Sequence, residues 1–236
     1  MRTGREDIRT PSRPAGPRRG IFPRGLFRRS LLLLPLCLAL SGCLETTGSG
    51  GDDAYFSSKR RPMGPVHASA GMAGGSVVVR GPDDYCIEGR SLKIRADGGF
   101  ALLARCDILS GGEMGNPVAL AMLTATVTPY EGTLPGAASM ARDFAAGGTP
   151  VLSSAERDGV RLLHLGAGGN ARVRAADPRQ WRAVFLVNGS LVSLAAYGPK
   201  DSAVAGSGGR ALLLSMARAI RAASPQSPAA APDDAG

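Results

Sequence analysis

The sequence predicts an α+β fold in which a C-terminal helix and at least one further helix pack on an antiparallel sheet. The clearest signal is a hairpin, because apolar runs at 181–187 and 190–197 flank Asn188-Gly189. Both residues of this dipeptide accept the positive φ that a tight hairpin turn needs. A second signal is an apolar stripe at helical spacing over 209–223. Clusters of β-branched and apolar residues elsewhere are typical of strands.

The chain opens with an arginine-rich segment and a short apolar run. Arg24, Arg28 and Arg29 precede the run 31–40, which is the order of a secretory signal peptide. The run is too short to cross a bilayer, since that takes about 20 apolar residues. It ends in Leu40-Ser41-Gly42-Cys43, where two small residues precede a cysteine.

This motif resembles the lipobox of bacterial lipoproteins. The resemblance implies that residues 1–42 are a signal peptide with a long basic n-region, that they are removed, and that Cys43 becomes a lipid-modified first residue bearing palmitate. It implies a periplasm-facing protein of the cell envelope that is bound to a membrane through its lipid. Leu44, in place of Asp, favours the outer membrane over the inner one. The alternative is an ordinary signal peptide cut nearby, with Cys43 left as a thiol.

The net charge of +9 lies mostly in this leader. Residues 1–42 hold nine arginines against two acidic residues, so the remaining residues carry only two net positive charges. A balanced mature chain lacks the basic surface that nucleic acid requires, and we expect no nucleic-acid partner. A basic cluster remains at Lys59-Arg60-Arg61, where it either contacts anionic head groups or is a solvated run of charge.

Composition divides the rest of the chain into three parts. Residues 43–75 predict a lipidated flexible tether, 76–223 a single globular α+β domain, and 224–236 a disordered tail. The elements expected within the domain are a strand at 76–80, a turn at 81–84, a strand or short helix at 90–95, a turn at 97–98, strands at 100–106 and 118–127, a loop at 129–136, a helix at 137–146, a strand at 160–165 and a turn at 166–170.

A two-residue turn fixes the register of the predicted hairpin. It pairs Phe185 with Val192 and Ala183 with Leu194, so these side chains share one face and form a core. The opposite face also carries apolar residues, such as Leu186, so we expect that face to be at least partly covered. The stripe of the closing helix consists of Leu213, Met216 and Ile220, and the middle helix has Met140 and Phe144 on one side.

Two cysteines remain in the predicted domain, Cys86 and Cys106, because Cys37 lies in the leader and Cys43 carries the lipid. The space beyond the inner membrane is oxidising, so the pair predicts a structural disulfide. Closing a loop of 20 residues stabilises a fold by on the order of 3 kcal/mol. A metal site would need a C-x-x-C motif or a nearby histidine, and a redox pair would be more closely spaced.

The sequence offers few groups for catalysis. His67 lies in the expected tether, and His164 lies in a predicted strand, where a hydrogen-bonded structural role is favoured over that of a base. The nucleophile motifs G-x-S-x-G and S-x-x-K are missing. Residues 166–171 match G-x-G-x-x-A, but neither a long helix nor an acidic residue follows at the right distance. We therefore expect no catalytic, cofactor-binding or metal site.

Two further resemblances bear on function. The order of strand, Asn-Gly, strand, loop and helix over 184–220 is similar to the end of the PsbP-like fold, which implies a non-catalytic accessory or binding module. Residues 81–86 with Cys106 resemble lipoproteins of alphaproteobacteria, which implies a compartment and no chemistry. The sequence thus predicts a membrane-anchored accessory or binding module with an envelope protein as a candidate partner. The alternative is a periplasmic hydrolase using Ser or Asp, which would need a polar cluster with shifted pKa values in a pocket.

Overall fold

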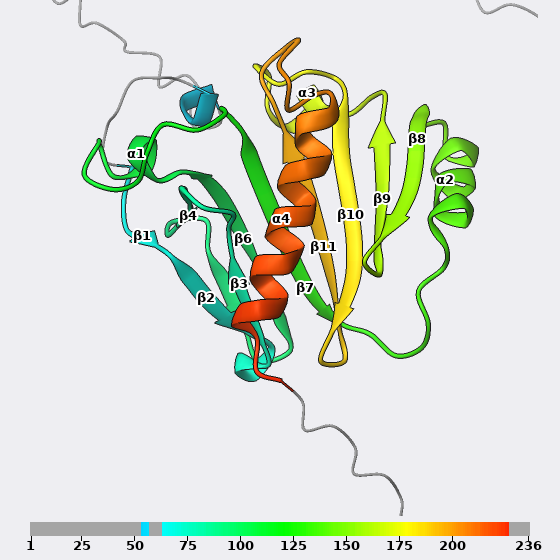
Figure 1. Ribbon diagram of the computed structural model, residues 1–236, viewed down its shortest axis with the longest axis horizontal. Coiled ribbons are helices and arrows are strands. Elements are labelled where there is room, and N and C mark those ends of the chain that lie inside the picture. The colour runs from blue at the N-terminus through cyan, green and yellow to red at the C-terminus, as the bar shows by residue number, and fades with distance from the viewer. Residues whose placement is uncertain (1–52, 57–62, 227–236) are drawn as a thin grey trace, which may run out of the picture. The chain divides into compact units, whose positions relative to one another are not determined.

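An antiparallel sheet dominates the part of the chain that the computed structural model describes, residues 53–56 and 63–226 (Figure 1). Its strands follow the order β1-β4-β6-β7-β11-β10-β9-β8, and β5 pairs with β6 outside this path. A separate two-stranded sheet consists of β2 and β3. Together with the helices this is the α+β architecture that the sequence predicts.

The elements have the following bounds. The strands are β1 (Val66–His67), β2 (Ser69–Met72), β3 (Val77–Arg80), β4 (Tyr85–Glu88), β5 (Lys93–Arg95), β6 (Gly98–Arg105), β7 (Met122–Pro129), β8 (Val151–Arg157), β9 (Val160–Leu165), β10 (Gln180–Val187) and β11 (Ser190–Tyr197). The helices are α1 (Cys106–Leu109), α2 (Ala137–Ala146), α3 (Gly169–Arg172) and α4 (Ser207–Ala223), and 3₁₀ turns cover Asp53–Phe56 (η1) and Ala73–Gly75 (η2).

The β10–β11 hairpin has the predicted register. Phe185 lies opposite Val192, and Ala183 lies opposite Leu194. The turn residues Asn188 and Gly189 have φ values of 47° and 73°, the left-handed conformation that this dipeptide tolerates. Residues distant in sequence complete the sheet, because β7 pairs with β11 and β9 with β10.

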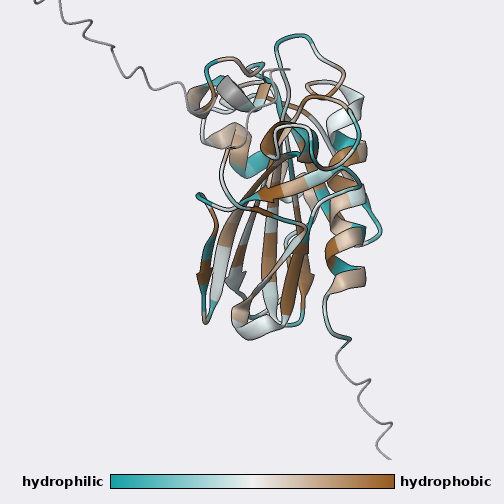
Figure 2. Cartoon of the chain, turned by 90° about the vertical axis from the view of Figure 1, so that its left-hand side faces the viewer, coloured by the Kyte–Doolittle hydropathy of each residue, from teal (hydrophilic) through white to brown (hydrophobic). Residues whose placement is uncertain are grey.

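Helix α4 and the β2–β3 hairpin cover one face of the sheet. Leu213, Met216 and Ile220 are fully buried there, in one cluster with Phe185 and Leu194. Figure 1 shows α4 in front of the sheet, and Figure 2, turned by 90°, shows the helix running along one side of the strands. The predicted helical stripe and the predicted hairpin core therefore meet in a sealed core.

Short segments cover the other face at one end of the sheet. Tyr55 of η1, Leu109 of α1 and Val173 after α3 are buried in a second cluster with Cys86 and Tyr197. These segments gather at the upper end in Figure 1. The sheet is thus covered along one face and partly covered along the other, as Leu186 and its neighbours led us to expect.

Two rings of the sheet hold the start of α4. Trp181 Nε1 donates a hydrogen bond to Gly206 O at 2.6 Å, and His164 Nε2 lies 2.8 Å from Ala205 O. The two rings stack with centroids 4.4 Å apart. Gly209 allows this close approach, since a Cβ there would lie 2.5 Å from Trp181 Cδ1. His164 therefore has the hydrogen-bonded structural role that its position in the strand predicts.

Several expected boundaries differ in the structure. Residues 66–72, expected in the tether, form β1 and β2, and Met72 is fully buried. Pairing with β4 and β3 supplies the apolar contacts that this segment's own composition lacks. Ser224, expected to begin the tail, is buried because its Oγ donates to Ile220 O and accepts from Val78 N.

Two turns and one strand also differ from the prediction. The turn before β6 consists of Ala96 and Asp97, since Arg95 pairs with Gly98. The segment 166–170 includes the start of α3, and the strand expected at 118–127 begins only at Met122. Strand β8, which pairs with β9, was not expected from the sequence.

Several sequence predictions lie outside the described residues. They concern the leader 1–42, the lipidation at Cys43, the basic cluster Lys59-Arg60-Arg61 and most of the tail. They therefore remain predictions.

Candidate functional site

The face of the sheet opposite α4 has short side chains at its centre. Because side chains alternate along a strand, the neighbours of the sealed core residues point away from α4. Thr126 on β7 lies between Phe100 on β6 and Ser193 on β11 in one cross-strand row. Thr124 lies beside Leu102 in the next row. Short side chains between longer ones leave the middle of this face recessed.

A hollow of about 400 Å³ occupies this recess. It spans strands β6, β7, β11 and β10, and the segment after α3 contributes to its wall. Its lining residues are Phe100, Leu102, Met122, Thr124, Thr126, Val173, Arg182 and Tyr197. The volume falls within the range of small-molecule sites, roughly 300–1,000 Å³. Its lining contains both apolar side chains and hydroxyl groups, so it suits a ligand that has both kinds of group.

A second hollow of about 200 Å³ continues the first toward β5. The two share Phe100 and Thr126, and the second is also lined by Lys93, Arg95 and Asp97. We call the two hollows together the sheet trough. From β10 to β5 the trough crosses four strand spacings, about 19 Å.

The trough carries basic groups at both ends. The guanidinium carbon of Arg182 lies 5.7 Å from the centre of the Tyr197 ring, a cation–π arrangement. Among the ion pairs of the described residues, none involves Arg182, Lys93 or Arg95. These three cations are therefore available for an anionic ligand, and Asp97 is the acidic residue in the lining.

Buried carboxylates elsewhere are held by structural bonds. Asp177 accepts hydrogen bonds from the Arg179 side chain at 2.9 and 2.7 Å and from the Asp201 backbone N–H at 2.8 Å. These bonds, above all the one from Arg179, hold the pKa of Asp177 well below its usual value. The Asp107 carboxylate accepts hydrogen bonds from Nε and Nη2 of Arg105 in the same way, and this hydrogen bonding raises the pKa of Arg105. The two pairs fix loops at the covered end of the sheet.

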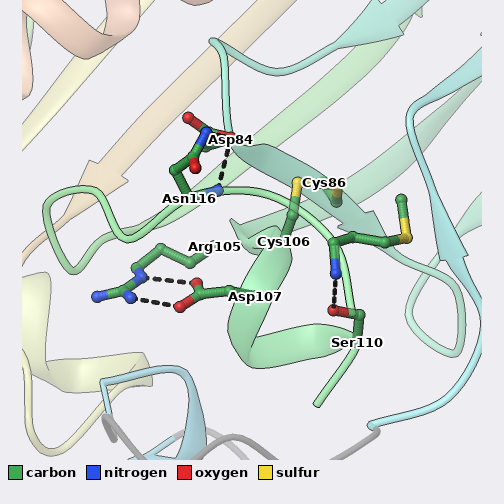
Figure 3. Close-up of a disulfide and its surroundings, with 8 residues drawn as sticks. Asp84, Cys86, Arg105, Cys106, Asp107, Ser110 and Asn116 are labelled. Carbon is green, nitrogen blue, oxygen red and sulfur yellow. Dashed lines mark hydrogen bonds and ion pairs between the residues drawn. A yellow bond between two sulfur atoms is a disulfide. The ribbon is translucent and has the colours of Figure 1, made fainter. Parts of the chain in front are cut away.

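The Cys86–Cys106 disulfide, predicted from the sequence, joins β4 to the start of α1 (Figure 3). Both cysteines are buried. Nearby, the Asp84 carboxylate accepts a hydrogen bond from the Asn116 backbone N–H at 2.8 Å. Burial raises the pKa of Tyr85 to about 12, and its hydroxyl donates to a backbone carbonyl. This region is a structural brace beside the trough.

Sequence reasoning overlooked the trough. The sequence predicts a hairpin that contains Arg182 and Tyr197 and a strand that contains Phe100, but it indicates no binding role for these residues. One signal was present, since Thr124, Thr126 and Thr128 recur at every second position of β7. This spacing places three hydroxyls on one face of a strand. The residues opposite them follow only from the pairing of β7 with β6 and β11.

The described residues contain no helix that is long and apolar enough to cross a bilayer. Within the same residues, no three metal-ligating side chains gather into a cluster that could hold an ion. Comparison of the chain with protein-family models, with curated proteins and with solved structures gives no match.

Proposed function

We propose that this protein is a lipid-anchored, non-catalytic binding module of the bacterial cell envelope and that the sheet trough is its binding site. The trough is the observation that carries the proposal. It is a recessed, partly apolar surface on a sheet whose other face is sealed by α4, and the cations at its two ends form no ion pair with the residues that the structure describes. Its charged groups serve to attract and orient a ligand.

The buried acidic groups also favour binding over the alternative of hydrolysis. A hydrolase needs an acid or base whose shifted pKa serves a reacting group in a pocket. Here Asp107 and Asp177 are each committed to a neighbouring arginine, and the Glu88 carboxylate to two backbone N–H groups. None of these three carboxylates lines the trough.

The proposed anchor is Cys43 in the motif Leu40-Ser41-Gly42-Cys43. Tyr55 is already buried against the domain, twelve residues after this cysteine. The ten residue steps from Cys43 to Asp53 reach at most about 35 Å when fully extended. The proposal therefore places the domain close to the membrane surface, and Leu44 favours the outer membrane.

Metabolic labelling with an alkyne analogue of palmitate tests the anchor. We expect the wild type and the control Cys37→Ser to be labelled and to sediment with membranes. Cys43→Ser should lose both properties. Retained labelling of Cys43→Ser, or an intact mass that includes residues 1–42, would contradict the proposed anchor.

Site-specific photo-crosslinking in living cells tests the binding site. A photoreactive residue at Thr126 lies in the trough, and one at the exposed Arg210 of α4 is the matched control. We expect a reproducible adduct from position 126 and none from position 210. Equal adducts from both positions, or adducts from α4 alone, would show that the trough is not the binding surface.

A further inference from the structure

We infer that the sheet trough binds an anionic oligosaccharide, laid across the strands with its charged groups at Arg182 and at Lys93 and Arg95. This inference rests on the proposed binding role and names the ligand class. The length of the trough favours an elongated ligand, since it crosses the four strand spacings from β10 to β5, about 19 Å. The position of the cations at both ends favours a ligand with more than one negative charge.

The hydroxyls on the floor favour a ligand rich in hydroxyl groups. Thr124, Thr126 and Thr128 line the two hollows, and no side-chain hydrogen bond of the described residues involves their hydroxyls. A hydroxyl both donates and accepts, so it complements the hydroxyls of a sugar. An acyl chain on this floor would leave these hydroxyls unpaired, at a cost in free energy.

An extended peptide fits this surface less well. Peptides add to a sheet through backbone hydrogen bonds at a free edge. The trough instead crosses β6, β7, β11 and β10, each of which has a strand on both sides, and it reaches an edge strand only at β5. Phe100 is half-buried between the two hollows, where it offers an apolar surface to the C–H face of a sugar ring.

Calorimetric titration of the purified full chain tests the ligand class. The probes are hexagalacturonate, which carries carboxylates, and maltohexaose phosphate, which carries phosphate. Their controls are methyl-esterified hexagalacturonate and plain maltohexaose. We expect at least one charged probe to bind, with its neutral control at least about tenfold weaker, the effect of losing one charge-assisted hydrogen bond.

Matched variants locate the binding. Arg182→Gln and Lys93→Gln should each weaken the charged probe about tenfold, whereas Arg210→Gln and Lys200→Gln, which change exposed side chains outside the trough lining, should leave it unchanged. Because Arg182→Gln also removes the contact with Tyr197, Lys93→Gln is the decisive variant. Its side chain is exposed, and no ion pair of the described residues involves it.

Three outcomes would overturn the inference. They are failure of both charged probes to bind, equal binding by all four variants, and binding of hexaglutamate as tight as that of the sugars. The last would point to an acidic peptide instead. Failure of the sugars with a Thr126-specific crosslink intact would remove the ligand class and leave the proposed function standing. A failure of palmitate labelling at Cys43 would overturn the proposed anchor, but it would not change how the titrations are interpreted.

Discussion

Leu194→Ala measures whether the α4 side of the sheet is a sealed core. Leu194 is fully buried and packs in one cluster with Phe185 and Leu213. The substitution removes three carbon atoms, which correspond to about 2.4 kcal/mol of transfer free energy. The cavity that remains adds to this loss, so we expect the free energy of unfolding to fall by about 3–4 kcal/mol.

Urea denaturation followed by the fluorescence of Trp181, the single tryptophan, gives this value. Thr126→Ala is the control, because it shortens a side chain on the trough face and should cost less than about 1 kcal/mol. A loss below about 1 kcal/mol for Leu194→Ala, or equal losses for the two variants, would refute the assignment of one sealed and one open face.

Three further predictions concern the covered end of the sheet. Replacing Cys86 and Cys106 by serine should lower the free energy of unfolding by about 3 kcal/mol in urea denaturation, and an unchanged midpoint would contradict a bracing role. Asp177→Asn should lower stability at pH 6. Because the pKa of Asp177 lies below its usual 3.8, the ionised carboxylate stabilises the fold fully above that pH, and this stabilisation is lost as the pH falls further. The free energies of unfolding of the wild type and of Asp177→Asn should therefore converge in acid. A difference that does not depend on pH would argue against this charge effect. Tyr55→Ala should speed hydrogen exchange of the Met63 N–H, which bonds to α1, while α4 stays protected; unchanged exchange at Met63 would show that Tyr55 does not hold this segment.

The sequence predicts those parts of the fold whose structure is determined by residues close to one another in the chain. Asn188-Gly189 determines its own turn, and the alternation on either side fixes the register of β10 and β11. The stripe of α4 is equally local. The disulfide was predictable from the cysteine count and the expected oxidising compartment, because few pairings were available.

Other strands depend on partners that are distant in sequence. Residues 66–72 contain few β-branched residues, and they form strands because β3 and β4 offer them an edge. The strand β8 is mostly exposed and polar, and it exists as the partner of β9. Propensity alone therefore underestimates strands at the edges of a sheet.

The trough could not be predicted because it is assembled from five strands. Phe100, Thr126 and Arg182 are separated by long stretches of sequence and come together only through the order β6-β7-β11-β10. The threonines of β7 were a local sign of a polar face. They did not indicate that cations would lie at both ends.

The central claim is that this protein binds its ligand in the sheet trough. Amide chemical-shift mapping of the isotope-labelled full chain, titrated with hexagalacturonate, tests it most directly. We expect the shifts to cluster at Phe100, Thr126 and Arg182 and to extend to Lys93. Shifts that cluster on α4 or β8 instead would contradict it.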